Sequence, residues 1–168
     1  MADVQLIGED LIAEVLDKAR RSSRQRMNYN FHAGPEDNPH RFLNIFIQGT
    51  YVAPHRHRNP PKAESFVVLD GFVTVICFND DGSVRSRHVL GHGPGADTLP
   101  PAFRGLPASR GIDVAPGVWH TIAAISPHAV CFEVKPGPWD PSTDKEPALW
   151  APPEGDPAAA EYLRQLLS

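Results

Sequence analysis

The chain has 168 residues and a net charge of −4. This length predicts a single domain with enough chain to bury a core. The negative balance, without a stripe of Lys and Arg, argues against a nucleic-acid-binding surface. No apolar run reaches the roughly 18 residues that span a bilayer, and residues 1–10 carry acids instead of a signal-peptide stretch. We therefore expect a cytoplasmic protein that binds neither nucleic acid nor membranes.

Helices are predicted only near the two ends of the chain. In residues 10–23 the apolar side chains recur at the helical period of 3.6, at Leu11, Ile12, Val15, Leu16 and Ala19. Near the other end, Asp156-Pro157 provides the start signal for a short helix over residues 158–167.

A change to a period of two after residue 24 predicts a first strand over residues 26–32. Its polar face consists of Arg26, Asn28, Asn30 and His32, and its apolar face of Met27, Tyr29 and Phe31. Such a polar face either meets solvent or lines a polar cavity, and its abundance of amides is compatible with the cavity. His32 is either a general acid or base near neutral pH or a structural hydrogen-bonding residue.

Further short strands separated by Gly/Pro turns follow. We expect them at residues 41–48, 50–57, 64–70, 72–79, 84–90, 112–114, 118–125 and 129–135. Residues 91–111 are predicted to form a long loop without periodicity. The pattern predicts an all-β jelly roll. We expect one domain with an N-terminal helix in residues 1–24, a barrel in 25–140, and an extended tail with a helix in 141–168.

Three His and one Glu form the candidate metal site. His55 and His57 are two residues apart on a strand, so both side chains point to one face. Glu64 begins the next strand, and His120 lies on a later one. Imidazole and carboxylate together suit one divalent transition metal such as Fe, Mn, Ni or Zn. A His-x-His pair alone also occurs on polar surface strands, but the added Glu64 and His120 favour the metal site.

The spacing of these residues resembles that of the cupin superfamily. The first cupin motif matches Gly49-x5-His55-x-His57-x6-Glu64-x6-Gly71, with a longer gap before the Glu than is usual. The second matches Gly111-x4-Pro116-Gly117-x2-His120, with Ala124 in place of the expected Asn. The resemblance implies a cupin double-stranded β-helix, or jelly-roll barrel, flanked by the two helices. It also implies that His55, His57, Glu64 and His120 are the metal ligands.

Several short segments are more specifically similar to the WbuC family of cupin-fold metalloproteins. They are Arg26-Met27-Asn28, Asn30-Phe31-His32, Pro54-His55-Arg56-His57, Pro60-Pro61-Lys62, Pro116-Gly117-x-Trp119-His120, Gly137-Pro138-Trp139-Asp140-Pro141 and Trp150-Ala151-Pro152. This similarity covers about residues 25–155. It implies a context of surface-polysaccharide metabolism, without a defined reaction.

We therefore expect a metal-binding cupin that acts on a small molecule, namely a sugar or sugar nucleotide, by isomerisation or epimerisation. The metal would act as a Lewis acid, and His32, the expected catalytic residue, or a water molecule beside Glu64 would move protons. Substrate contacts are expected from Arg26, Asn28, Asn30, Asn44 and Lys62, although Lys62 also fits a solvated surface position.

Two other functions remain open, and we expect the protein to form a homodimer whichever function is correct. Three His and one Glu also resemble the site of Fe(II)-dependent dioxygenases among the cupins. Alternatively, the barrel binds a ligand without catalysis and its metal is structural. Because cupins are frequently dimers and residues 27–31 offer an apolar strand face, we expect a homodimer.

Overall fold

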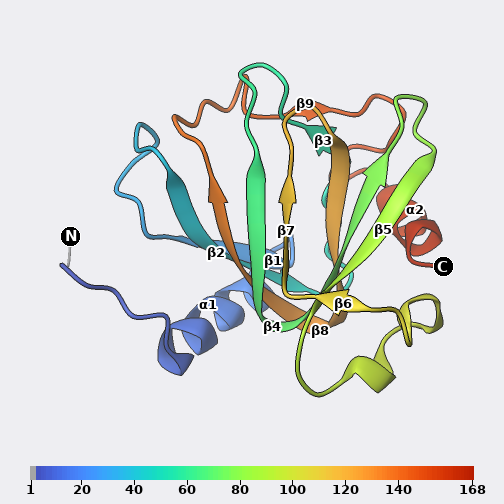
Figure 1. The fold of residues 1–168 in the computed structure, drawn as a ribbon, viewed down its shortest axis with the longest axis horizontal. Coiled ribbons are helices and arrows are strands. Elements are labelled where there is room, and N and C mark those ends of the chain that lie inside the picture. The colour runs from blue at the N-terminus through green and yellow to red at the C-terminus, as the bar shows by residue number, and fades with distance from the viewer. Residues whose placement is uncertain (1–2) are drawn as a thin grey trace.

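Two layers of β-sheet form the body of the protein, and one α-helix packs against the outside of each layer (Figure 1). The computed structural model describes residues 3–168. The elements in chain order are α1 (Glu9–Arg21), β1 (Arg26–Asn30), β2 (His40–Ile47), β3 (His55–Arg56), β4 (Glu64–Phe78), β5 (Val84–Gly91), the 3-10 helices η1 (Ala96–Thr98) and η2 (Pro101–Phe103), β6 (Ala108–Ser109), β7 (Gly111–Val114), β8 (Trp119–Lys135), β9 (Glu146–Pro147) and α2 (Ala159–Leu166). Neither α-helix in this range is long and apolar enough to cross a membrane.

The long strands β4 and β8 pair antiparallel and run through both layers. The first half of β4 pairs with the second half of β8, and the two remaining halves pair with each other. The register shifts between Gly71 and Val73, where β4 bends. Gly71 has φ +73°, and a Cβ atom there would lie 2.3 Å from the carbonyl oxygen of His128. Only glycine fits such a bend without displacing the neighbouring backbone.

The remaining strands extend these two halves into facing layers. One layer adds β2 and β1 beside β8, with β7 beside β4, and the other adds β5 and β6 beside β4, with β3 and β9 beside β8. Apolar side chains from both layers meet between them, including Phe46, Val68, Val75, Leu90 and Ile122. The predicted all-β, cupin-type jelly roll with terminal helices is therefore confirmed.

Helix α1 packs against the outer face of β1 and β2. Its buried residues Val15 and Ala19 contact Leu43 and Ile45 of β2. The apolar face of residues 27–31, from which we expected a dimer contact, packs in the same cluster. Because α1 of the same chain covers this face, the homodimer stays a prediction without that support.

The segment between β5 and β7 differs from the featureless loop that we expected. It contains η1, η2 and the short strand β6. Leu99 and Phe103 are buried against Phe72 and Ile125, so two apolar anchors hold the segment on the barrel. Sequence periodicity could not reveal this because Leu99 directly follows η1 and Phe103 ends η2, and three-residue helices are too short to show a period.

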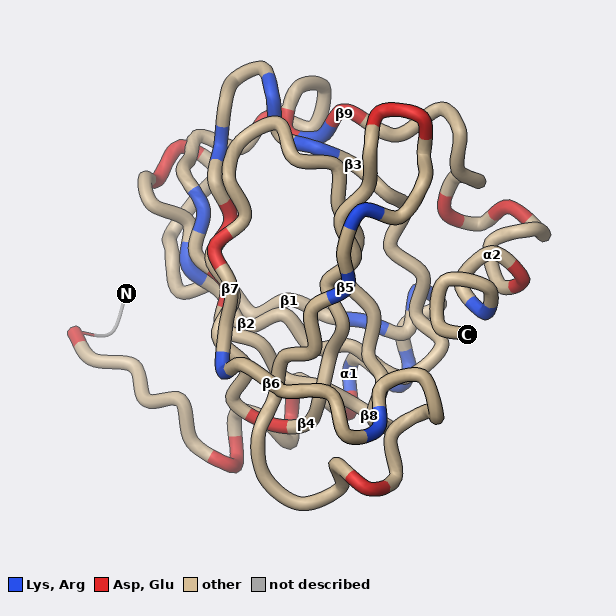
Figure 2. The backbone as a smooth tube through the Cα atoms, turned by 45° about the vertical axis from the view of Figure 1, so that its right-hand side comes forward, with Lys and Arg blue, Asp and Glu red and all other residues tan. Residues whose placement is uncertain are grey.

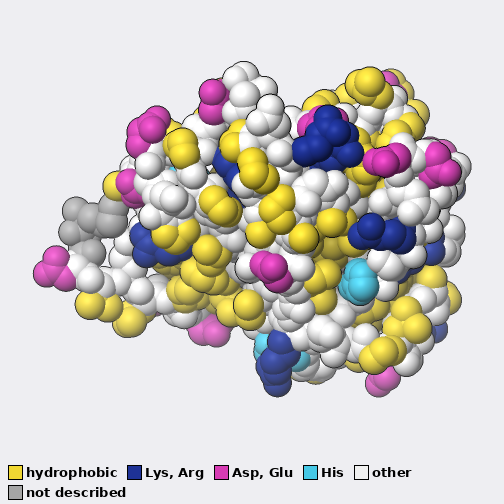
Figure 3. All heavy atoms as spheres, turned by 45° about the horizontal axis from the view of Figure 1, so that its top comes forward, with side chains coloured by type: hydrophobic (Ala, Val, Ile, Leu, Met, Phe, Trp, Pro, Cys, Tyr) yellow, Lys and Arg dark blue, Asp and Glu magenta, His cyan; other side chains and the backbone are white. Residues whose placement is uncertain are grey.

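Figure 2 shows Lys and Arg and also Asp and Glu scattered along the backbone, with acidic residues at the turn between β4 and β5. Charged residues of both signs and apolar side chains are mixed on the face of the molecule drawn in Figure 3.

Candidate metal centre

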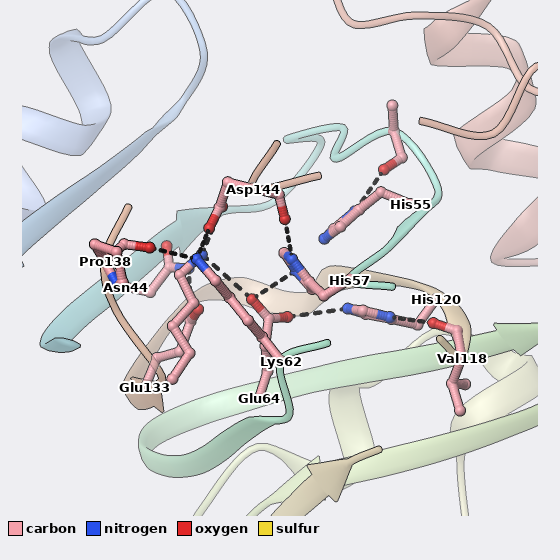
Figure 4. Close-up of polar contacts among 12 residues, drawn as sticks. Asn44, His55, His57, Lys62, Glu64, Val118, His120, Glu133, Pro138 and Asp144 are labelled. Atoms are coloured by element: carbon pink, nitrogen blue, oxygen red, sulfur yellow. Dashed lines mark hydrogen bonds and ion pairs between the residues drawn. The ribbon is translucent and has the colours of Figure 1, made fainter. Parts of the chain in front are cut away.

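Four side chains from three strand regions converge inside the barrel (Figure 4). His55 lies on β3, His57 just after it, Glu64 at the start of β4, and His120 near the start of β8. His55 and His120 are directly paired across β3 and β8, which brings their rings together. All four residues are buried, and one potential ligand atom from each lies within 4.8 Å of the others. The structure thus brings together the whole predicted ligand set.

Backbone carbonyl groups fix the orientation of the three imidazole rings. The Nδ1 atoms of His55 and His120 lie 2.9 Å from the carbonyl oxygens of Ala53 and Val118. The Nδ1 atom of His57 is hydrogen-bonded to the carbonyl oxygen of Asp144. A carbonyl oxygen can only accept, so each Nδ1 donates its proton and leaves the Nε2 lone pair free. This is the tautomer that metal-binding histidines adopt through such outer contacts.

The Nε2 atoms and the carboxylate form a cluster of acceptors. Nε2 of His57 lies 2.9 Å from Oε1 of Glu64, and Nε2 of His120 lies 3.0 Å from Oε2. Nε2 of His55 is buried without a hydrogen-bond partner among residues 3–168. Lone pairs at such distances repel one another unless a proton or cation lies between them. The donor set therefore fits a divalent transition metal, with nitrogen ligands for Fe, Ni or Zn and a carboxylate that also suits Mn.

The charge states of the cluster also fit a cation. Burial, which dominates, lowers the pKa of His55 well below its usual range. Burial alone would raise the pKa of Glu64, but its close contacts with the rings of His120 and His57 and the charge of Lys135 hold it well below its usual value. His55 thus offers a neutral imidazole and Glu64 an ionised carboxylate, the forms that bind metals.

A second group of buried charges connects the cluster to the chain after β8. The carboxylate of Asp144 lies 3.0 Å from the ammonium groups of both Lys62 and Lys135. Lys62 also donates to the carbonyl oxygen of Pro138 at 2.6 Å, and Lys135 lies 3.4 Å from Glu64. Because the Asp144 carbonyl also accepts a hydrogen bond from His57, Asp144 links the segment 138–147 to two of the candidate metal ligands, His57 directly and Glu64 through Lys135.

Glu133 is the buried carboxyl group that sequence reasoning missed. It is 4% exposed and accepts a 2.8 Å hydrogen bond from Asn44. Burial, followed by the nearby charge of Glu64, raises the pKa of Glu133 to about 8. The signal was present in the sequence: Cys131, Glu133 and Lys135 alternate on one face of a strand. Asp144 had no comparable signal because it lies in an irregular segment.

Two connected cavities lead to the cluster. An inner cavity of about 130 Å³ is lined by His55, Glu64, His120 and Glu133, together with apolar side chains such as Phe66. An outer cavity of about 730 Å³ lies between β1 and the segment around residues 139–145. The two share one set of lining residues, here called the neck: Arg24, Arg26, Asn28, Phe42, Lys135 and Lys145. A ligand in the outer cavity can therefore extend one end toward the metal cluster.

The predicted substrate-binding residues divide between these spaces. Arg26 and Asn28 belong to the neck, Asn30 lines the outer cavity and Asn44 lines the inner one. The position of Lys62 matches neither of our two expectations, which were a contact with the substrate and a solvated side chain. It is 4% exposed, lines neither cavity, and its ammonium group is held by Asp144 and Pro138. The buried carboxylate supplies the partner that draws this lysine inward.

His32 lies in the outer cavity, away from the metal ligands. Its ring stacks on that of His40 with 4.0 Å between centroids. Its Nδ1 atom lies 3.2 Å from the backbone nitrogen of Arg41, which donates to it. His32 does not line the inner cavity, whereas the carboxyl group of Glu133 does.

Several solved structures are similar to this chain in fold. CapF from Staphylococcus aureus, a capsular polysaccharide assembling protein, is similar with a TM-score of 0.53 and 18% identity. The match covers 74% of this chain and 32% of CapF, so the chain spans about a third of CapF. Protein SO0799 from Shewanella oneidensis matches with a TM-score of 0.56 and 10% identity over 84% of this chain and 85% of the other. A cupin 2 barrel domain protein from Leptotrichia buccalis matches with a TM-score of 0.44 and 15% identity, over 67% and 41% of the two chains.

At these identities the likenesses concern the fold alone. No curated protein matches the chain. Residues 7–90, which contain α1, the first strands and three of the four candidate ligands, match the family described as Domain of unknown function (DUF6016). This match spans half of the 168 residues, and the chain belongs to that family.

Proposed function

We propose that the protein is a metal-dependent enzyme that isomerises or epimerises a small polyhydroxylated substrate, a sugar or sugar nucleotide. The observation that carries this proposal is the convergence of three Nε2 atoms and one carboxylate at the inner end of a polar cavity. Four protein ligands leave coordination positions free on a five- or six-coordinate metal. When bound, the metal would polarise a carbonyl or hydroxyl oxygen of the substrate.

The residues of the inner cavity support proton transfer. Glu133 lines the same small space as His55, Glu64 and His120. Its carboxyl group accepts a hydrogen bond from Asn44 but forms no ion pair within 4.0 Å in residues 3–168. A buried carboxyl group that exchanges a proton near neutral pH suits general acid–base catalysis. We therefore assign the proton transfer to Glu133, in place of His32.

The lining of the cavities supports a hydroxyl-rich substrate. The Oδ1 atom of Asn44 is buried without a hydrogen-bond partner among residues 3–168, so it can accept from a substrate hydroxyl. Asn28 and Asn30 add amides along the wall of the outer cavity. Its volume of about 730 Å³ lies within the range for small-molecule sites, about 300–1,000 Å³. The surface-polysaccharide context rests on the WbuC-like segments of the sequence, and WbuC membership stays part of this proposal.

The test measures exchange of substrate protons with solvent, so the product need not be known in advance. The metal-loaded protein is incubated with a panel of aldoses, ketoses and their nucleotide conjugates in D2O, and loss of substrate C–H signals is followed by NMR. We expect deuterium incorporation at one carbon with the wild type and at least a hundredfold slower incorporation with Glu133→Gln. Glu146→Gln, a surface carboxyl change near β3, serves as the control and should leave the rate unchanged.

Metal content separates the parts of this proposal. We expect near-stoichiometric transition metal in the wild type and its loss in a His55→Ala/His120→Ala variant. An equally metal-free wild type would contradict the metal site. A metal-loaded protein that exchanges no proton on any panel member would contradict the isomerase and leave a binding protein with a structural metal.

The apolar part of the inner wall favours one second candidate. Val52, Phe66 and Ile122 line the inner cavity beside the cluster and would shelter molecular oxygen from water. This observation supports an Fe(II)-dependent dioxygenase. Oxygen consumption that requires both iron and a substrate would identify this activity, whereas proton exchange without oxygen consumption would exclude it.

A further inference from the structure

Unpaired positive charge gathers at the neck between the two cavities. Four of the neck residues are cationic: Arg24, Arg26, Lys135 and Lys145. Two of them are already neutralised. Arg26 lies 2.5 Å from the carboxylate of Glu154 and 2.9 Å from the carbonyl oxygen of Tyr51. Lys135 is held by Asp144 and Glu64.

The other two cations have no such partner. Within residues 3–168, no carboxylate oxygen lies within 4.0 Å of the charged groups of Arg24 or Lys145. Lys145 lies between Asp144, which turns inward to the two lysines, and Glu146, which pairs with Arg56. Its own neighbours are therefore committed elsewhere. Lys145 lines the inner cavity together with His55 and Glu133, and it also lines the outer cavity.

Both cations stand on backbone that the fold holds in place. The hydroxyl oxygen of the buried Thr50 lies 2.5 and 2.6 Å from the carbonyl oxygens of Arg24 and Gln25. On the opposite side, the Asp144 carbonyl accepts a hydrogen bond from His57, and Glu146 in β9 pairs with Arg56 in β3. Arg24 and Lys145 thus approach the neck from two fixed segments, which reduces the ordering cost of binding a ligand between them.

Resting on the proposed function, we infer that the substrate carries an oxyanion, a phosphate ester or a carboxylate on a polyhydroxylated carbon chain, and that Arg24 and Lys145 bind it at the neck. Guanidinium and ammonium groups form strong charge-assisted hydrogen bonds to both kinds of oxyanion. With the oxyanion at the neck, the hydroxylated end of the chain reaches the Asn44 and Glu133 side chains in the inner cavity. The site would then select charged sugars over neutral ones.

The test uses three probes with one carbon skeleton. Sorbitol, sorbitol 6-phosphate and gluconate are titrated into the metal-loaded protein by calorimetry at low salt. We expect at least one charged probe to bind about tenfold or more tightly than sorbitol, and the tighter of the two identifies phosphate or carboxylate as the recognised group. In Arg24→Gln/Lys145→Gln this preference should fall by about tenfold or more. Arg85→Gln/Arg110→Gln removes the same charge outside both cavities and should change binding by less than about twofold.

Two results would overturn the inference. One is equal binding of charged and neutral probes by the wild type, and the other is an unchanged preference in Arg24→Gln/Lys145→Gln. Metal content is measured on the same samples, because a bound metal also attracts anions. If the double variant keeps its metal and the preference, the oxyanion contacts the metal rather than these cations. If the wild type holds no metal, the proposed function fails, and the anion preference is still scored by the two pairs of variants.

Discussion

At the scale of single residues, Asp144 connects more parts of the site than any predicted residue. Its carbonyl holds the ring of His57, and its carboxylate neutralises Lys62 and Lys135. Lys62 and Lys135 bring two positive charges, while Glu64 and Asp144 bring two negative ones. This balance allows four charged groups to be buried together, because an unpaired charge would be costly to desolvate.

We predict that Asp144→Asn destabilises the protein and weakens its hold on the metal. Losing the carboxylate leaves two buried ammonium groups with too few partners, so the free energy of unfolding should fall by about 3 kcal/mol or more. Metal affinity should fall by about ten- to a hundredfold, as with other outer contacts of metal ligands. Urea unfolding and metal competition titrations measure the two effects. In Glu146→Gln, a part-exposed pair with Arg56, both effects should be small, about 1 kcal/mol or less in stability.

The buried position of Glu133 predicts how the free energy of unfolding changes with pH. Its pKa is about 8 in the folded protein, against an unfolded value near 4.5, so the folded state keeps a proton that the unfolded state releases. Stability from this group is present below the unfolded pKa and is lost as the pH rises toward 8. Relative to Glu133→Gln, the wild type should therefore lose stability between about pH 4.5 and 8, by at most about 1.4 kcal/mol per pH unit. Parallel unfolding curves at all pH values would contradict the raised pKa.

At the scale of elements, the bend in β4 lets one strand serve both layers. The first half of β4 carries Glu64 and Phe66, and the second half carries Val73 and Val75, with Gly71 between them. Since β8 makes the same passage, the strand pair sets the distance between the layers and hence the position of His120 opposite His55.

We predict that Gly71→Ala is more damaging than Gly117→Ala. Both glycines have positive φ, +73° and +79°, so each substitution incurs about 1–2 kcal/mol of backbone strain. A Cβ atom at Gly71 would also collide with the carbonyl oxygen of His128, whereas at Gly117 it meets nothing within 4 Å among the described residues. The unfolding free energy should fall by more than about 3 kcal/mol for Gly71→Ala. Equal losses in the two variants, measured by urea unfolding, would show that the close approach does not matter.

At the scale of the whole molecule, the segment after β8 is part of the barrel and not an appended tail. Strand β9 pairs with β3, and Lys62 and Lys135 bind Asp144. Helix α2 buries Leu166 in the cluster around Ile76 and Phe78. Metal binding, the barrel mouth and the C-terminal segment are therefore expected to stabilise one another.

We predict that metal binding raises the unfolding temperature of the whole protein in one transition. The unfolded chain cannot hold the four ligands together, so metal at a hundred times its dissociation constant should add about 2.7 kcal/mol of stability. Thermal unfolding with and without a chelator measures this shift. His55→Ala/His120→Ala should abolish it, and two separate transitions would contradict the single domain expected from the sequence.

The sequence by itself determined the jelly roll, the terminal helices and the four candidate metal ligands. Periodicity reports which face of an element is apolar, and His55, His57, Glu64 and His120 lie at regular positions on strands or beside them, where residue parity gives the direction of the side chain. Only the tertiary structure decided the outer contacts. Asp144 and Lys145 lie in a segment without periodicity, and Lys62 turns inward only because Asp144 lies there to receive it. Likewise, the apolar face of β1 is complete in the sequence, but that α1 covers it depends on long-range packing that no local pattern records.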